Sequence, residues 1–311
     1  MRVISKTQEH EIASVFVAEN GDGKLIEFVE STQPPMVISK KWVIIVSTLF
    51  GCPVDCKFCD AGGDYKGKLS AADIFFQIDY LVNHRFPSGV PETDKFKVQF
   101  ARMGEPSFNP AVLEVLEQFP GKYPIDNFVA SLSSIAPHGT DNFFEELLRI
   151  KKGLYDQSFQ LQFSVHSTDV EQRNMLMPVT KWSFGKMAAY GERFYSEGGK
   201  KITLNFALGK DNILDPHTLK QYFDPDIFLV KLTPVNPTFK ARLNNIDSLI
   251  VRGEKEYPVV DGLKAVGYEV ILSIGEWEEN KIGSNCGQYI KALDESCHVP
   301  EGSYSYKLKD V

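Results

Sequence analysis

The sequence predicts an α/β fold, a partial TIM-like (β/α)6 barrel that carries a small N-terminal β-hairpin appendage. Two observations lead to this prediction. Apolar runs of strand length alternate with amphipathic patterns of helix length between residues 42 and 274, and such alternation gives parallel strands joined by helical crossovers. The chain has 311 residues, of which 43% are hydrophobic, so it is long enough to bury one large core.

The N-terminal appendage is predicted from residues 11–30, which form two apolar runs around Asn20-Gly21-Asp22-Gly23. Asn, Asp and Gly tolerate positive φ, so this tetrapeptide predicts a tight hairpin turn. Pro34-Pro35 then interrupts the pattern. We therefore expect residues 1–41 to form the appendage, residues 42–275 the barrel and residues 276–311 a C-terminal segment.

The barrel is expected to begin with a strand from Trp42 to Phe50, followed by a helix from Ala71 to His84 that Ser70 caps. Further strands are predicted at 96–101, 127–132, 159–165, 201–207, 227–233 and 268–274. Helical patterns lie between them, near 110–119, 140–152, 183–197, 216–223 and 258–266. These elements make six to seven βα units. In a barrel of this kind the reacting groups gather on the loops that follow the strands.

Composition gives the chain no general attraction to nucleic acid, because 41 acidic and 34 basic residues leave a net charge of −7. The N-terminus lacks an apolar signal segment, and no run approaches the roughly 18 consecutive apolar residues of a membrane span. We expect a cytoplasmic protein with no membrane partner.

Cys52, Cys56 and Cys59 lie on the loop after the first barrel strand, in a C-x3-C-x2-C spacing. Three thiolates on one short loop can hold three irons of a [4Fe–4S] cluster and leave the fourth iron open for a small chelating molecule. Zinc is the alternative, but it needs a fourth ligand and no further Cys or His follows until His84. A disulfide framework fits poorly, because the chain has five cysteines and three of them are crowded together.

Polar residues follow several of the predicted strands at the same rim of the barrel. Each of them alone is more often a cap, a core hydrogen-bonding group or a solvated loop acid. Taken as a set on one face they form a polar cup for a zwitterionic ligand. The set comprises Glu105 in the turn M-G-E-P, Ser133, Ser164, His166 and Asn236. His166 is also placed where a titrating imidazole could act.

Cys286 stands between small and polar residues in the stretch from Gly283 to Gln288, after the last predicted strand. A thiol in an exposed loop is a candidate for covalent chemistry. The alternative is an inert, small hydrophobic side chain. Cys297 lies eleven residues further on, and an unremarkable thiol is the simplest interpretation of it.

The cysteine loop resembles the signature of the radical S-adenosylmethionine (SAM) enzymes, with Phe58 just before the last cysteine. Five further motifs occur in the order M-G-E-P-x-x-N, S-L-S-S-I-A-P, F-S-V-H-S with R-N-M-L-M-P-V, L-T-P-V-N-P and N-C-G-Q. Together they resemble the RlmN/Cfr family of radical SAM methyl synthases, from about residue 11 to residue 290. The resemblance implies a barrel of the radical SAM type, a [4Fe–4S] cluster on the three cysteines, and SAM held or bordered by Phe58, Gly104, Glu105, Ser133, Ser164, His166 and Asn236.

The resemblance also implies a reaction. One SAM methylates Cys286, and an electron from a reductant such as flavodoxin or ferredoxin cleaves a second SAM to a 5'-deoxyadenosyl radical. That radical takes hydrogen from the S-methyl group, and the resulting carbon radical adds to an sp² carbon of adenosine in RNA. Such a carbon is no nucleophile toward SAM, so the one-carbon group must arrive as a radical.

Three departures from the family bear on the substrate. The family has a second cysteine seven residues before the first cluster cysteine, and Ile45 occupies that position here. Cys297 is the one remaining cysteine that could take its role. RlmN-type enzymes carry an N-terminal helical RNA-binding domain, and this chain begins too close to the hairpin to contain one. The stretch before Cys286 carries acids in place of arginine, namely Glu276, Glu278 and Glu279, which repel a phosphate backbone.

These departures predict transfer of a methyl or methylene group through Cys286 to a small molecule or nucleoside rather than to ribosomal RNA. Three alternatives stay open. The first is methylation of RNA adenosine, with a partner supplying the missing domain. The second is hydrogen abstraction from the substrate without methyl transfer. The third is a cluster-bearing binding module that never turns SAM over.

Overall fold

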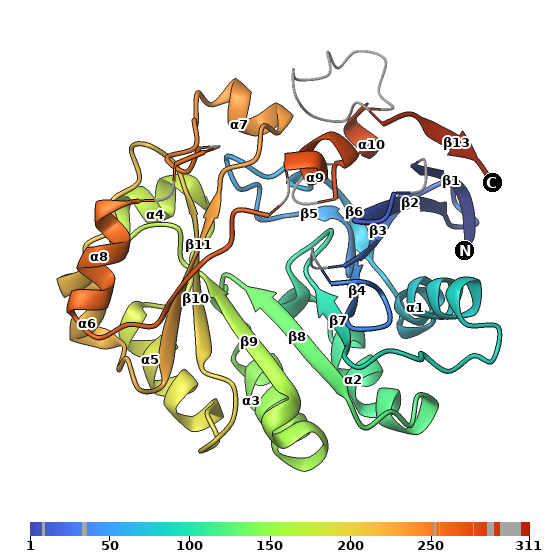
Figure 1. Ribbon diagram of the computed structural model, residues 1–311, viewed down its shortest axis with the longest axis horizontal. Helices are drawn as coiled ribbons and strands as arrows, with labels where there is room; N and C mark the ends of the chain where they lie inside the picture. The colour runs from blue at the N-terminus through green and yellow to red at the C-terminus, as the bar shows by residue number, and fades with distance from the viewer. Residues whose placement is uncertain are drawn as a thin grey trace.

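The computed structural model describes residues 1–7, 10–32, 36–251, 253–254, 256–275, 277–284, 289–292 and 306–311. Within these residues the main feature is an eleven-stranded sheet in the order β12-β11-β10-β9-β8-β7-β4-β3-β2-β1-β13 (Figure 1). The strands from β12 to β4 run parallel to their neighbours. They are β4 (Trp42–Val46), β7 (Phe96–Phe100), β8 (Phe128–Ser134), β9 (Phe159–Ser164), β10 (Ile202–Leu208), β11 (Phe228–Pro234) and β12 (Val270–Leu272).

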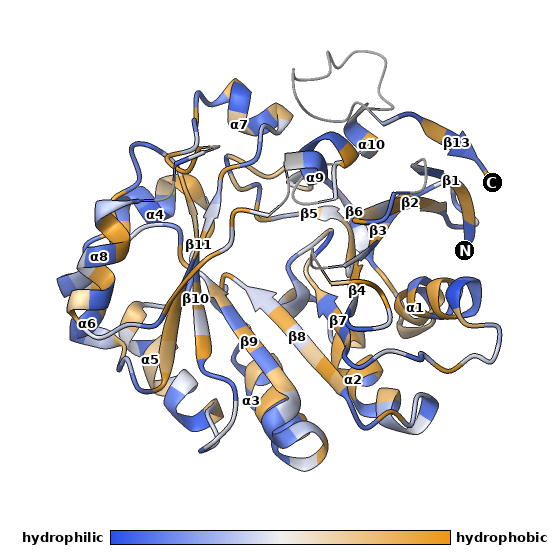
Figure 2. Ribbon diagram, in the orientation of Figure 1, coloured by the Kyte–Doolittle hydropathy of each residue, from blue (hydrophilic) through white to orange (hydrophobic). Residues whose placement is uncertain are grey.

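Helices connect these strands and lie along the outside of the curved sheet (Figure 1). Their inward faces are apolar and their outward faces polar, as α1 shows most clearly (Figure 2). The helices are α1 (Ala71–Arg85), α2 (Ala111–Lys122), α3 (Asp141–Ile150), α4 (Val170–Leu176), α5 (Phe184–Phe194), α6 (Pro216–Tyr222), α7 (Phe239–Leu243) and α8 (Pro258–Ala265). Single turns add η1 (Pro106–Phe108), η2 (Lys151–Tyr155) and η3 (Asp156–Ser158).

Side chains alternate between the two faces of the parallel sheet. On β4, Trp42, Ile44 and Val46 are fully buried on the helix side, whereas Val43 and Ile45 are half-buried on the other face. We call that second face the inner face. Farther along the sheet its residues are largely polar, including Lys97 and Gln99 on β7, Gln160 and Gln162 on β9, Asn205 on β10 and Lys231 on β11.

The N-terminal hairpin is part of the same sheet. β2 (Ala13–Glu19) pairs antiparallel with β3 (Leu25–Ser31), and β3 pairs antiparallel with β4. The side chain of Asn20 holds the turn by accepting hydrogen bonds from the N–H groups of Asp22 and Lys24 at 3.0 and 2.8 Å. β1 (Arg2–Thr7) and β13 (Leu308–Asp310) extend this edge. The C-terminal helices α9 (Trp277–Ile282) and α10 (Tyr289–Ala292) lie beside β2 and β3 (Figure 1).

The predicted α/β partial barrel is confirmed, with one local difference after its first strand. Instead of one strand from 42 to 50, β4 ends at Val46, and β5 (Leu49–Cys52) starts a two-stranded sheet with β6 (Gly63–Lys68). The chain leaves the main sheet because distant groups bind its backbone there. Ser47 N–H donates to Gln77 Oε1 at 2.8 Å, and Thr48 N–H donates to the carbonyl of Met103 at 2.8 Å.

Among the helices that the structure describes, none has the length and apolar character needed to cross a bilayer.

Candidate active site

The three cysteines follow the end of the first barrel strand, as the sequence predicted. Cys52 is the last residue of β5 and is buried, and Cys56 and Cys59 are half-buried on the loop that follows. Gly51 has φ of +73°, and a Cβ atom there would lie 2.5 Å from the Asp64 carbonyl oxygen. Only glycine therefore fits at the point where the strand delivers the first cysteine.

The electrostatics of the three thiols fit a positively charged group between them. Burial raises the pKa of Cys52 to about 11, while the backbone N–H groups of Val54, Glu105 and Asp55 favour its thiolate form. Burial also raises the pKa of Cys56, and the negative charges of Cys59 and Cys52 raise it further. The three sulfurs thus repel one another when ionised, and N–H groups already point at one of them, as in the cysteine shells of iron–sulfur clusters. Among the described residues no three acidic, His or Cys side chains converge on the position of a single metal ion.

The cysteine loop is fixed to the far side of the barrel. Thr238 donates its hydroxyl to the Phe58 carbonyl at 2.8 Å, and the Asp60 carboxylate accepts the N–H groups of Phe239 and Lys240 at 3.1 and 3.0 Å. Asp55 forms an ion pair with Lys240. The first turn of α7 is therefore held against the loop that carries the cysteines. Sequence reasoning missed Asp55, Asp60, Thr238 and Lys240, although Asp60 directly follows Cys59.

Glu105 is the buried carboxylate of the site, with 5% of its surface exposed. Its Oε1 accepts hydrogen bonds from Ser107 N, Ser107 Oγ and Ser134 Oγ at 3.0, 2.7 and 2.6 Å, and its Oε2 accepts one from Ile135 N at 3.0 Å. Burial raises its pKa against the effect of these bonds. The partner from β8 is Ser134. Ser133, which was predicted to border SAM, is half-buried one residue earlier, and its role stays a prediction.

His166 is buried beside the cysteine loop. Its ring meets the ring of Phe58 edge-on, with centroids 4.8 Å apart, and its Nδ1 accepts the N–H of Ala207 at 2.9 Å. Nδ1 is thereby an acceptor, which leaves the proton of the neutral ring on Nε2. Burial, helped by the charge of Arg173, lowers the pKa to about 3. In the folded chain His166 is therefore expected to be neutral and to offer its Nε2–H as a donor.

The other predicted SAM-binding residues lie at the same end of the strands. Gly104 follows β7 with φ of +98°, and a Cβ atom there would lie 2.5 Å from Leu49 Cγ, so the turn packs directly on the strand that leads to Cys52. Ser164 ends β9 half-buried on the inner face, and Asn236 follows β11 and is half-buried too. Their role in binding SAM stays a prediction.

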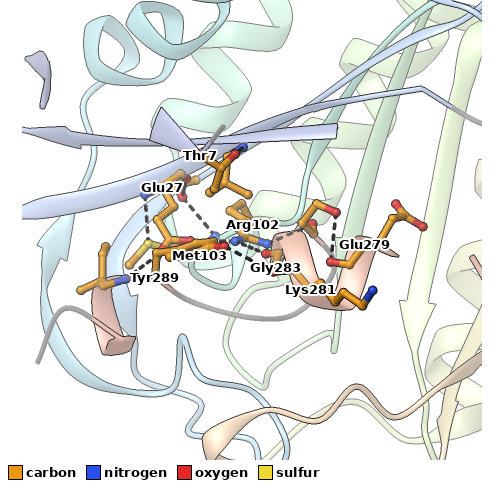
Figure 3. A network of polar contacts seen from close by, with 12 residues as sticks. Thr7, Glu27, Arg102, Met103, Glu279, Lys281, Gly283 and Tyr289 are labelled. Atoms are coloured by element: carbon orange, nitrogen blue, oxygen red, sulfur yellow. Dashed lines mark hydrogen bonds and ion pairs between the residues drawn. The ribbon is translucent and has the colours of Figure 1, made fainter. Parts of the chain in front are cut away.

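Cys286 and Cys297 lie outside the described residues, but the residues that flank Cys286 are held by a buried ion pair (Figure 3). Arg102 Nη2 lies 2.7 Å from Glu27 Oε2, and both side chains are at most 1% exposed. Arg102 also donates to the carbonyls of Gly283 and Ser284 at 2.8 and 3.1 Å. Glu27 Oε1 accepts the N–H of Ile290 at 2.7 Å. One ion pair therefore binds the chain on both sides of Cys286.

These flanking residues approach both the cysteine loop and Ile45. A small cavity of about 80 Å³ is lined by residues of both segments, including Gly51, Asp60, Met103 and Ile290. Ile45 packs in an apolar cluster whose other members include Val29, Ile282, Tyr289 and Ile290. Position 45 thus adjoins the segment that carries Cys286.

A curved parallel sheet with three cysteines after its first strand is the arrangement expected from the resemblance to the radical SAM enzymes. The same fold occurs in a radical SAM methyltransferase from Sphaerobacter thermophilus, with a TM-score of 0.67, 19% identity, and coverage of 92% of this chain and 80% of that one. No protein-family model matches the chain.

In sequence the chain is similar to dual-specificity RNA methyltransferases named RlmN. It is 27% identical to that of Halorhodospira halophila over 90% of this chain and 74% of the relative. It is also 27% identical to that of Wolinella succinogenes over 85% of this chain and 74% of the relative. It spans 56% of the length of a similar protein from Heliobacterium modesticaldum, again at 27% identity.

The predicted resemblance to the RlmN/Cfr type of radical SAM enzyme is thereby confirmed. The chain is thus similar to enzymes of the radical SAM methyltransferase type, and the cofactors of that type are a [4Fe–4S] cluster and SAM. Cys52, Cys56 and Cys59 are the residues that fit the cluster.

Proposed function

We propose that this enzyme transfers a one-carbon group through Cys286 to an sp² carbon of its substrate. The observation that carries the proposal is the buried Arg102–Glu27 pair, which binds residues on both sides of Cys286 next to the cysteine loop. A thiol used only for packing needs no such anchoring of its flanks. When bound, SAM supplies a methyl group for a thiolate. The cluster and a second SAM supply a 5'-deoxyadenosyl radical that removes a hydrogen atom from that S-methyl group.

The protein's own contribution is to bind and orient these groups. Three hydrogen bonds fix Oε1 of Glu105, whereas Oε2 accepts the Ile135 N–H and, with two lone pairs, can also accept an ammonium N–H of SAM. Neutral His166 offers an Nε2–H donor at the same rim. With SAM bound, Cys286 would be the nucleophile: its thiolate would accept the methyl group as the sulfonium C–S bond breaks and S-adenosylhomocysteine leaves, and its thiol proton would go to solvent.

A small molecule or nucleoside is the substrate we favour. Glu278 and Glu279 in α9 lie close to the segment that carries Cys286, and carboxylates there oppose a phosphate backbone. RNA adenosine is the second candidate, because the relatives are named RNA methyltransferases. If RNA is the substrate, binding should weaken steeply with salt.

We further infer a cytoplasmic enzyme that receives its electron from a flavodoxin-like or ferredoxin-like protein. The cysteine loop must stay reduced to hold its cluster, and a reducing compartment provides that.

The test is anaerobic incubation of the cluster-loaded protein with SAM and dithionite, followed by mass spectrometry of the peptide that contains Cys286. We expect a mass increase of one methyl group, which Cys286→Ser abolishes and Cys297→Ala leaves intact. An unmodified Cys286 in protein that cleaves SAM to 5'-deoxyadenosine would overturn the proposal and favour direct hydrogen abstraction.

A further inference from the structure

Five lysines gather at the parallel strands: four of them lie within two residues of the N-terminal end of a strand, and Lys231 lies midway along β11. Lys41 and Lys95 directly precede β4 and β7, and the Trp42 N–H donates to the Lys95 carbonyl at 3.0 Å, which sets these two lysines side by side. Lys97 follows on the same face of β7 as Lys95. Lys231 lies on β11 and Lys200 just before β10. All five are half-buried. We call them the lysine floor.

The lysines of the floor meet across the inner face of the sheet. Lys97 Nζ donates to Gln160 Oε1 at 2.8 Å, although β8 lies between their strands. Burial and then the charges of Lys231, Lys41, Lys95 and Lys200 lower the pKa of Lys97 to about 7. Burial lowers the pKa of Lys41, with smaller effects from Lys95, Lys231 and Lys200. Four strands separate β4 from β11 in the sheet, yet the charge of Lys231 contributes to lowering the pKa of Lys41, as expected where the sheet curves back on itself.

Gathering like charges in a partly buried site costs stability, because burial and mutual repulsion both disfavour the ammonium form. Sequences keep such an arrangement mainly where a site needs it. An anion placed among the ammonium groups removes the cost. Lysine is a common phosphate ligand because its ammonium is a compact charge with three donors.

We propose that the lysine floor binds the phosphate groups of a ligand that lies along the inner face of the barrel. Gln160 and Asn205, on the same face, provide amide groups for the polar body of such a molecule. Arg102, which binds the Cys286 segment, follows Lys97 by five residues, and five residues of a strand span about 16 Å. A molecule that spans from the floor to the Cys286 segment is therefore extended and phosphorylated. That the ligand is the substrate rests on the proposed function, but its binding to the floor does not.

The experiment measures thermal unfolding of the purified protein in phosphate-free buffer of low ionic strength. The probes are inorganic phosphate, tripolyphosphate and a short single-stranded RNA, and sodium chloride of equal ionic strength controls for screening. We expect tripolyphosphate to raise the Tm further at each higher concentration, roughly with the logarithm of the concentration once the site is filled, as a ligand of the folded state does. Tighter binding of the RNA than of tripolyphosphate would show that the lysines bind the phosphates of an oligonucleotide. Binding of tripolyphosphate without binding of the RNA would show that the ligand is a phosphorylated small molecule.

Matched variants make the test specific. Lys97→Gln should raise the Tm of the ligand-free protein, and Lys97→Gln and Lys231→Gln should each weaken tripolyphosphate binding at least tenfold. Lys220→Gln, on the exposed side of α6, should change neither. The proposal fails if tripolyphosphate stabilises the native protein no more than sodium chloride does, or if the Lys97 and Lys231 variants bind it as tightly as the native protein. Cys286→Ser should bind normally, so a failure of the proposed methyl transfer would leave this result standing.

Discussion

Arg102 binds Glu27 at 2.7 Å in the interior, where both side chains are at most 1% exposed. Glu27 comes from β3 and Arg102 follows β7, so the pair ties the N-terminal hairpin to the barrel. The pair also forms hydrogen bonds with Gly283, Ser284 and Ile290. Burial raises the pKa of Glu27, and the charge of Arg102 and the Ile290 N–H oppose this. The pair is thus the meeting point of the hairpin, the barrel and the chain around Cys286.

Removing Arg102 should loosen that chain. Arg102→Ala leaves the Glu27 carboxylate buried without its partner and the carbonyls of Gly283 and Ser284 without their donor. Breaking a buried pair in this way typically costs about 3–5 kcal/mol. We expect a loss of that order in the free energy of unfolding by urea, and faster hydrogen exchange of the Ile290 amide.

Arg149→Ala is the matched control for this loss, because Arg149 pairs with Glu146 on the surface with 59% of its side chain exposed. Solvent screens such an exposed pair, so its loss should change the free energy of unfolding little. Arg102→Lys should restore part of the protection of Ile290. Unchanged exchange of the Ile290 amide in Arg102→Ala would contradict an anchoring role.

The sequence predicted the parallel core well because its signals are local. Strand 96–101 was expected and β7 is Phe96–Phe100, and the helix expected at 71–84 is α1, Ala71–Arg85. The end of β4 was missed because the groups that divert the chain at Ser47 and Thr48 come from Gln77 and Met103. Spacing alone marked the three cysteines. Nothing local marked the pairing of Glu27 with Arg102, which lie 75 residues apart.

A cysteine at position 45 should restore the chemistry that Ile45 lacks. Ile45 packs against an apolar cluster that contains Ile282 and Tyr289, which flank the segment of Cys286. In Ile45→Cys we expect a disulfide between the introduced thiol and Cys286 in oxidised protein, detected by mass spectrometry without reductant. Val43→Cys is the control, since Val43 lies two residues earlier on the same inner face of β4. Equal disulfide yields in the two variants would show that position 45 has no special access to Cys286.

Loss of one cysteine of the loop should remove the cluster. Protein purified without oxygen should contain about four irons and four sulfides. Cys56→Ala should retain far less iron, while Cys297→Ala keeps the full amount, as measured by iron and sulfide assay with electron paramagnetic resonance of the reduced protein. Addition of SAM should change that spectrum if one iron is open to it. Native protein with zinc and no sulfide would show that the loop is a zinc site instead.

His166 should make the fold sensitive to acid. Its pKa is lowered to about 3 in the folded protein, mainly by burial, whereas a histidine in the unfolded chain titrates near about 6.5. Below the unfolded value the unfolded chain binds a proton that the folded protein does not. Stability is therefore lost as the pH falls from about 6.5 toward 3, by up to roughly 1.4 kcal/mol per pH unit for one proton.

The measurement is urea unfolding at a series of pH values between 7 and 4. His166→Asn should flatten the dependence of the unfolding free energy on pH by up to one proton, although the variant is less stable at pH 7 because the Ala207 N–H loses its acceptor. His138→Gln changes an exposed histidine on the loop after β8 and should leave the slope as it is. If His166→Asn shows the same slope as the native protein, the imidazole ionises in the folded state and is not the buried neutral donor described above.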